Sequence, residues 1–274
     1  DDVKIYCMPY PSCGSSTVSL QNALDFVSGW SERWQLKLAA KKCLVFTVND
    51  RRTAPSSNMY TINDHTLDFV RTIRDLGIEV DSRLRYEDYV NIITYKAATI
   101  SRLLRISLVS TDWRILNLAF CTFVRLILEY GSQVWNPHCR YLVDKIERVQ
   151  KTFTRFIPSV SGLSYKDRLQ FLDLQSLEKR RLIADLVFCY KLINHLVNTS
   201  MSLSFAPTNI ISTRGHSYTL RLNIYTCDAV KYFYTNRIVA VWNSLPADVV
   251  NCSSVSSFKL SLKSVNFDTF LYYS

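Results

Sequence analysis

The spacing of apolar residues changes near Leu84, and this change limits the possible folds more than any other feature of the chain. Before it, one helical pattern at 16–36 is combined with short runs rich in β-forming residues, at 44–48, 59–62, 67–70 and 74–80. After it, apolar residues recur every three or four positions, as on the buried face of a helix. The sequence therefore predicts an α+β fold, with a small antiparallel sheet in residues 1–82 and a mainly α-helical remainder.

The helical part has features that predict how its helices pack. A helix that starts after Ser110 or Thr111 is apolar nearly all round, so we expect it to be central to its bundle, with a buried face made of Trp113, Leu116, Phe120, Phe123 and Ile127. The next helix, at 142–157, is expected to hold two ion pairs on its outer face, Asp144–Arg148 and Glu147–Lys151. Residues 198–230 are polar and weakly patterned.

The net charge of +10 is unevenly distributed along the chain. Residues 1–82 carry 9 Lys/Arg and 10 Asp/Glu, a net charge of −1, whereas residues 83–274 carry 24 and 13, a net charge of +11. A neutral part followed by a basic part favours a polyanionic partner for the second part. A generic solubilising charge is the alternative.

The eight cysteines show no paired spacing, which argues against a zinc site and for buried thiols in a reducing compartment. The longest helical apolar run lies between Arg114 and Arg125 and is too short to cross a bilayer. We therefore expect a cytoplasmic or nuclear protein with no membrane partner.

Two adjacent carboxylates, Asp1 and Asp2, precede an alternating apolar run that predicts a strand, Val3, Ile5 and Cys7. A hairpin tip before such a strand can hold two carboxylates around a cation. Acidic residues at a chain end are also commonly just solvated charge, and this alternative stays open. Because the motif has no lead-in, we expect a fragment whose first half is missing.

Several groups of residues follow one another in an order that is similar to a known family. They are Asp1-Asp2, the stretch 38–43 with Lys42 and Cys43, Asp75-Leu76-Gly77, the stretch 125–137, and the tail motifs Arg168-Leu169, Leu177-Glu178, Arg180-Arg181 and 242–246. With them the chain resembles the C-terminal half of the reverse transcriptase of non-long-terminal-repeat retrotransposons of the jockey type. Ala39 and Leu126 replace the family's usual Asn and Pro, as expected for a decaying copy of a mobile element.

The resemblance implies a division of the chain and a chemistry. Residues 1–82 would be the C-terminal part of the polymerase palm, 83–137 thumb-like helices, and 138–274 a helical C-terminal region. In the intact parent, an RNA-directed DNA polymerase, two Mg²⁺ ions would catalyse nucleotidyl transfer.

The same resemblance assigns roles to three residues near the start of the chain. Asp1 would be the principal Mg²⁺ ligand, Asp2 a supporting ligand, and Lys42 the residue that protonates or stabilises the leaving pyrophosphate. Another metal-binding Asp belongs to an upstream strand of the family. We therefore expect the chain alone to incorporate no nucleotides.

The partners implied by the resemblance are an RNA template, a DNA primer, and the upstream fingers and palm half. Five basic residues of the helical part are the candidate nucleic-acid contacts: Lys96, Arg102, Arg105, Arg180 and Arg181. For Arg180 and Arg181 the alternative is a salt bridge to Glu178 or Asp185. Two other interpretations stay open for the whole chain. It could be a non-enzymatic nucleic-acid-binding remnant, or it could be either a helical interaction module or a relic with no present role.

Overall fold

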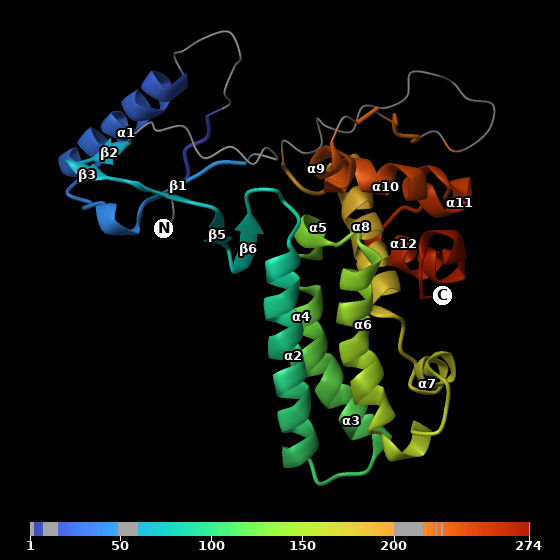
Figure 1. The fold of residues 1–274 in the computed structure, drawn as a ribbon. Helices are drawn as coiled ribbons and strands as arrows, with labels where there is room; N and C mark the ends of the chain where they lie inside the picture. The colour runs from blue at the N-terminus through green and yellow to red at the C-terminus, as the bar shows by residue number, and fades with distance from the viewer. Residues whose placement is uncertain are drawn as a thin grey trace. The chain divides into compact units, whose positions relative to one another are not determined.

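The computed structural model describes residues 3–7, 16–48, 60–199, 216, 218–222, 224–225 and 227–273. The chain forms two compact units, Asp1–Leu84 and Arg85–Ser274 (Figure 1). Helices dominate and the strands form small sheets, so the predicted α+β class is confirmed.

In the first unit, one helix packs on a hairpin. Helix α1 (Ser16–Arg33) ends three residues before the predicted position. The side-chain amide of Gln21 donates to the Thr61 carbonyl at 2.9 Å and accepts from the Thr61 N–H at 3.1 Å. Since Thr61 begins strand β2 (Thr61–Ile62), these bonds hold α1 against the hairpin of β2 and β3 (His65–Thr66).

The predicted small antiparallel sheet is confirmed only in part. The strands form three separate pairs, of which β2–β3 and β5–β6 (Thr72–Asp75 and Ile78–Asp81) are antiparallel, whereas β1 and β4 (Leu44–Phe46 and Asp68–Val70) are parallel. The chain between β1 and β4 is long enough for the crossover that a parallel pair needs. Residue type predicts that such short runs are strands, but it does not say which strands pair or in which direction.

The turns of the two hairpins have different sequence signals. The turn predicted at Asn63-Asp64 is confirmed, with positive φ angles of 47° and 61° that suit a tight hairpin. The single strand predicted at 74–80 is wrong, because the chain reverses at Leu76 and Gly77, where φ is 46° and 85°. Glycine adopts such angles freely, but leucine does so rarely, and the apolar Leu76 made the segment look like a continuous strand.

The second unit begins with long helices that pack side by side (Figure 1). Helix α2 (Glu87–Ser107) packs against α4 (Arg125–Glu129) and against α6 (Arg140–Arg155). Helix α3 (Trp113–Ala119) continues into α4 through η2 (Phe120–Val124), a π-helical turn. The short α5 (Ser132–Trp135) then leads to α6.

The sequence predicted that the continuous segment α3–η2–α4 is central to its bundle, and this prediction is wrong. Its outer face exposes Leu118, Phe123 and Leu126 by 68%, 56% and 60%. The π-helical turn inserts one extra residue, which moves the buried stripe by one position. Val124 and Leu128 are therefore buried where the regular spacing had placed Phe123 and Ile127.

Helix α8 (Leu177–Ile193) connects the two halves of this unit. It contacts α4, α5 and α6, and it also contacts α10 (Tyr234–Asn243) and α12 (Val255–Ser261). The core between α8, α10 and α12 includes Trp242 and Phe258, both fully buried. The remaining short elements are η1 (Ala40–Lys42), η3 (Pro158–Val160), α7 (Tyr165–Phe171), α9 (Asp228–Lys231), α11 (Ala247–Val250), η5 (Leu262–Ser264) and η6 (Asp268–Phe270).

Candidate nucleic-acid interface

The predicted catalytic residues are only partly covered by the structure. Asp1 and Asp2 lie outside the described residues, whereas Lys42 is exposed at the end of η1, just before β1. Among the residues that the structure describes, no three His, Cys, Asp or Glu side chains lie together as a metal site would need. The roles of Asp1, Asp2 and Lys42 with Mg²⁺ therefore stay predictions.

Helices α2 and α6 lie parallel to each other. Near their starts, the Lys145 ammonium donates a hydrogen bond to the side chain of Asn91. Near their ends, the guanidinium of Arg105 lies 3.2 Å from the centre of the Phe156 ring. Because residues 91 and 145 meet at one end and residues 105 and 156 at the other, both helices run in the same direction.

Basic side chains collect where these two helices meet solvent. On α6, Lys145, Arg148 and Arg155 are exposed and lie on one side of the helix, since they recur at spacings of three and seven. On α2, Arg105 reaches α6 through Phe156, and Arg102 lies about 60° away from it around the helix. We call the set Arg102, Arg105, Lys145, Arg148 and Arg155 the basic face.

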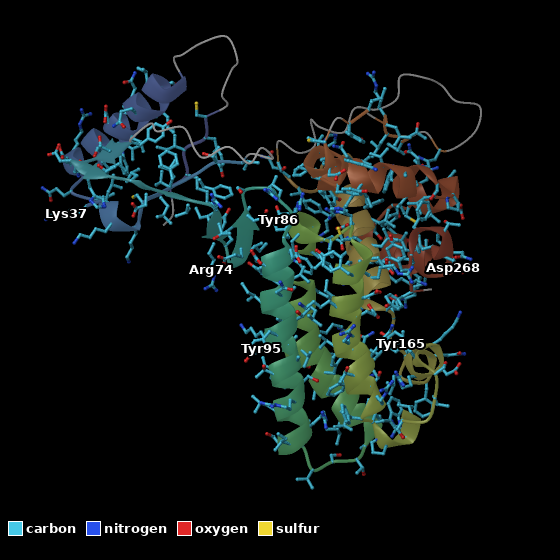
Figure 2. All side chains as sticks on the ribbon, in the orientation of Figure 1. Lys37, Arg74, Tyr86, Tyr95, Tyr165 and Asp268 are labelled. Carbon is cyan, nitrogen blue, oxygen red and sulfur yellow. The ribbon has the colours of Figure 1, made fainter. Side chains whose placement is uncertain are left out.

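Both acidic residues of α6 are bonded to other parts of the chain, so the two predicted ion pairs on this helix are wrong. Glu147 is fully buried and accepts hydrogen bonds from the Tyr165 hydroxyl, at the start of α7 (Figure 2), and from the Leu177 N–H at 3.0 Å. Asp144 accepts from the Tyr273 hydroxyl, and the Lys151 ammonium lies 3.9 Å from the centre of the Tyr273 ring. The free N–H at the start of α8 attracts the Glu147 carboxylate, which a pattern within α6 does not reveal.

Lys96 is exposed on α2 but does not belong to the basic face. Six residues separate it from Arg102, which places the two side chains about 120° apart around the helix. The two predicted contacts Arg102 and Arg105 are thus brought together with three basic residues of α6, and Lys96 is not.

Arg180 is partly exposed and Arg181 is buried, and both are held by partners that the sequence did not suggest. Arg180 forms a two-point ion pair with Glu129 of α4, with 2.9 Å between Nη2 and Oε2. Arg181 is only 1% exposed, and its Nε donates to the Asn136 side chain at 2.9 Å. A buried guanidinium cannot reach a phosphate, so Arg181 is wrong as a nucleic-acid contact. Arg180 does pair with a carboxylate, but with Glu129 rather than Glu178 or Asp185.

These arginines belong to a buried polar network. Asp185, also 1% exposed, accepts from Arg237 at 3.0 Å and from the Asn136 amide at 3.3 Å. Burial lowers the pKa of the Arg181 guanidinium, and nearby carboxylates oppose this effect, first among them Glu147. Burial likewise raises the pKa of Glu147, while its hydrogen bond from Tyr165 and the charge of Arg181 lower it. The network joins the end of α5 to α8 and α10 by hydrogen bonds between their side chains.

The family-like motifs meet in this network. Glu129 and Asn136 come from the stretch 125–137, and Arg180 and Arg181 come from the start of α8. The tail motif at 242–246 also holds two segments together. The Asn243 side chain accepts a hydrogen bond from the Leu220 N–H and donates one to the Leu220 carbonyl, both at 2.8 Å. These motif residues therefore hold distant segments of the chain together.

Sequence reasoning missed Lys145, Arg148 and Arg155. Their spacing on the polar side of the 140–155 helix was visible, but the neighbouring Asp144 and Glu147 made that side look electrically balanced. The balance disappears only when the two carboxylates are bonded elsewhere.

The comparisons with known proteins identify no family for this chain. No family model matches it, and no solved structure matches it. The chain is 27% identical over 118 residues to the uncharacterized protein B0403.1 of Caenorhabditis elegans, and the match covers 40% of this chain and 58% of that protein. Among the described helices, none has both the length and the apolar character needed to cross a membrane.

Proposed function

We propose that this chain is part of an RNA-directed DNA polymerase and that its helical unit binds an RNA–DNA duplex along the basic face of α2 and α6. The observation that supports this proposal is the collection of five cations on one side of two parallel helices, while the two carboxylates of α6 are hydrogen-bonded to other segments of the chain. The alternative of generic surface charge predicts acidic and basic side chains mixed on that side.

The dimensions of the basic face suit a nucleic-acid backbone. Lys145 and Arg155 are ten residues apart, which is about 15 Å along the helix axis. A duplex carries one negative charge for about every 1.7 Å of its length, so several phosphates face a surface of this size. Buried residues on the inner sides of the helices, among them Val90, Ala97, Ile146 and Phe153, keep the cations in place. Contacts of this kind position a duplex without reading its sequence.

The salt dependence of duplex binding tests the proposal. Binding of a 20-base-pair RNA–DNA hybrid to the 274-residue chain is measured by fluorescence anisotropy at several salt concentrations. The double variant Arg102→Gln, Arg148→Gln should lower the slope of log K against log salt by about 1.8, because each lost phosphate contact removes about 0.9. The loss should be the same for hybrids of different sequence.

Two controls make this experiment specific. The double variant Lys166→Gln, Lys263→Gln removes the same charge from exposed positions outside the basic face and should leave the slope unchanged. Lys96→Gln should also leave it unchanged, because Lys96 lies on another side of α2. A slope that is equal in the basic-face variant and in the wild-type chain would place Arg102 and Arg148 among ordinary solvated residues and refute the proposal.

The polymerase part of the proposal is supported by the resemblance of the motifs. In a polymerase that contains this chain, Asp1 and Asp2 would hold Mg²⁺ and Lys42 would stabilise the leaving pyrophosphate. Primer extension by such a protein, compared with its Asp1→Ala variant, separates the polymerase from a non-enzymatic nucleic-acid binder. The binder would hold duplex equally well in both forms and extend no primer in either.

A further inference from the structure

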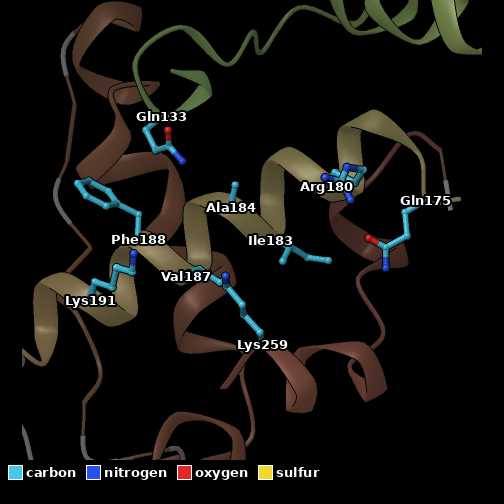
Figure 3. Close-up of a pocket in the computed structure, with 9 residues that line it drawn as sticks. All are labelled: Gln133, Gln175, Arg180, Ile183, Ala184, Val187, Phe188, Lys191 and Lys259. Atoms are coloured by element: carbon cyan, nitrogen blue, oxygen red, sulfur yellow. The ribbon is translucent and has the colours of Figure 1, made fainter. Parts of the chain in front are cut away.

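A groove of about 410 Å³ lies along helix α8, and no basic-face residue is among the described residues that line it (Figure 3). This volume is in the range of sites that hold small ligands or short segments of larger ones. The residues that line it come from α5, α8 and α12 and from the segment before α8. The groove has no part in the duplex contact that we propose for the basic face.

The floor of the groove is apolar. Ile183, Ala184, Val187 and Phe188 recur at spacings of three and four, so they lie on one side of α8. The Phe188 ring packs at 5.3 Å from the Tyr234 ring, centre to centre, which fixes its position. The groove therefore offers a rigid apolar surface with one aromatic side chain.

The rim of the groove is basic. Arg180 and Lys191 stand at its two ends, eleven residues or about 16 Å apart along α8, and Lys259 of α12 lies between them (Figure 3). Arg180 is already paired with Glu129. Among the described residues, the ammonium groups of Lys191 and Lys259 have no hydrogen-bond or ion-pair partner. No carboxylate lines the groove within this part of the chain, so the groove is suited to an anion with an apolar portion.

Two side-chain amides complete the lining, those of Gln133 and Gln175. Their backbone carbonyls are occupied, the first by Arg237 and the second by Gln150. The side-chain amides themselves can donate and accept hydrogen bonds at the edge of a ligand.

We infer that this groove binds single-stranded nucleic acid, with bases against the floor at Phe188 and phosphates at Lys191 and Lys259. Bases stack on aromatic and apolar surfaces while cations follow the backbone, and this combination is what single strands require. The choice of a nucleic acid over an acidic peptide rests on the proposed function, because the same unit carries the basic face.

The test uses a fluorescein-labelled ten-nucleotide uridine RNA and the whole chain. The groove variant Lys191→Gln, Lys259→Gln should bind this RNA about tenfold more weakly at low salt. The salt slope should fall by about 1.4, since each phosphate contact with a single strand contributes about 0.7. The double variant Lys166→Gln, Lys263→Gln removes equal charge elsewhere and should bind as the wild-type chain does. Thermal unfolding followed by circular dichroism should coincide for all three proteins, because the exchanged lysines are not in the core.

An abasic ten-mer with the same phosphates tests the floor. It should bind the wild-type chain about tenfold more weakly than the RNA, because base stacking contributes on the order of 1 kcal/mol or more per base. Equal binding of the abasic strand would overturn the assignment of bases to the floor. A ten-residue glutamate peptide that competes as well as RNA of equal length would assign the groove to acidic peptides instead.

Duplex binding separates this inference from the proposed function. The groove variant should bind the RNA–DNA hybrid with an unchanged salt slope, whereas Arg102→Gln, Arg148→Gln should change it. A groove variant that loses no more RNA affinity than the control would overturn the groove inference and leave the duplex proposal standing. An unchanged duplex slope in the basic-face variant would overturn the proposed function even if the groove binds RNA.

Discussion

Replacing Asp185 by alanine is expected to lower the free energy of unfolding of the helical unit by about 3–5 kcal/mol, because the buried Arg181 and the largely buried Arg237 lose a counter-charge. Arg237 donates to Asp185 from both Nε and Nη2, at 3.2 and 3.0 Å. Arg181 lies close enough for the Asp185 charge to raise its pKa, and its two terminal nitrogens have no hydrogen-bond partner among the described residues. A loss of this size is a large part of the 5–15 kcal/mol that typically holds a protein folded.

Urea unfolding followed by circular dichroism measures this effect, with Asp248→Ala as the control. Asp248 is exposed near the start of α11, so its loss should change stability by less than about 0.5 kcal/mol. The variant Arg237→Met should also be destabilising, since it leaves Asp185 buried without its main partner. The double change Asp185→Leu, Arg237→Met should cost less than the sum of the two, because it leaves neither charge alone. Additive losses would show that the two side chains do not act as a pair.

Replacing Trp242 by alanine is expected to cost a similar 3–5 kcal/mol, through loss of packing in the core of α8, α10 and α12. The indole is fully buried, and its ring centre lies 6.0 Å from that of Phe258. Its N–H also donates to the Tyr218 carbonyl at 2.8 Å. The substitution therefore removes both a large apolar group and an anchor for the segment that includes Tyr218.

Two comparisons distinguish the packing from the hydrogen bond. Trp242→Phe keeps most of the ring but leaves the Tyr218 carbonyl without its donor, which should cost about 1–3 kcal/mol. Trp34→Ala removes a tryptophan that is 63% exposed and should change stability far less. Hydrogen exchange at the Leu220 amide, which is bonded to Asn243, should become faster in Trp242→Ala. Unchanged unfolding free energy in Trp242→Ala would contradict the position of this side chain at the centre of the core.

The polar network explains what the charged residues of the family-like motifs do in this structure. Conserved-looking charged residues invite a functional interpretation, and Arg180 and Arg181 at the start of a helix looked like contacts for an anion. In the folded chain, Arg180 pairs with Glu129, and Arg181 donates to Asn136 and lies near Asp185. The motifs at 125–137 and at the start of α8 are therefore in contact with each other. The exposed cations of the basic face lie instead on α2 and α6.

Only the part of the candidate site that lies within a single helix could be predicted from the sequence. Arg102 and Arg105 could be placed together because both lie off the apolar stripe of α2 and are three residues apart. The contribution of α6 could not, since it depends on where the Asp144 and Glu147 side chains go. Glu147 turns toward the N–H of Leu177, thirty residues later in the chain. No pattern within α6 contains that information.

Four features could be predicted from the sequence: the α+β class, the helical character of the chain after Leu84, the turn at Asn63-Asp64 and the excess of positive charge in the second part. These follow from local spacing and residue type, which are properties of neighbouring residues. Three other features became visible only in the folded chain: the parallel pairing of β1 with β4, the shift of the buried stripe after η2, and the burial of Arg181. Each of these depends on contacts between segments far apart in the chain, where packing and the desolvation of charge outweigh local preference.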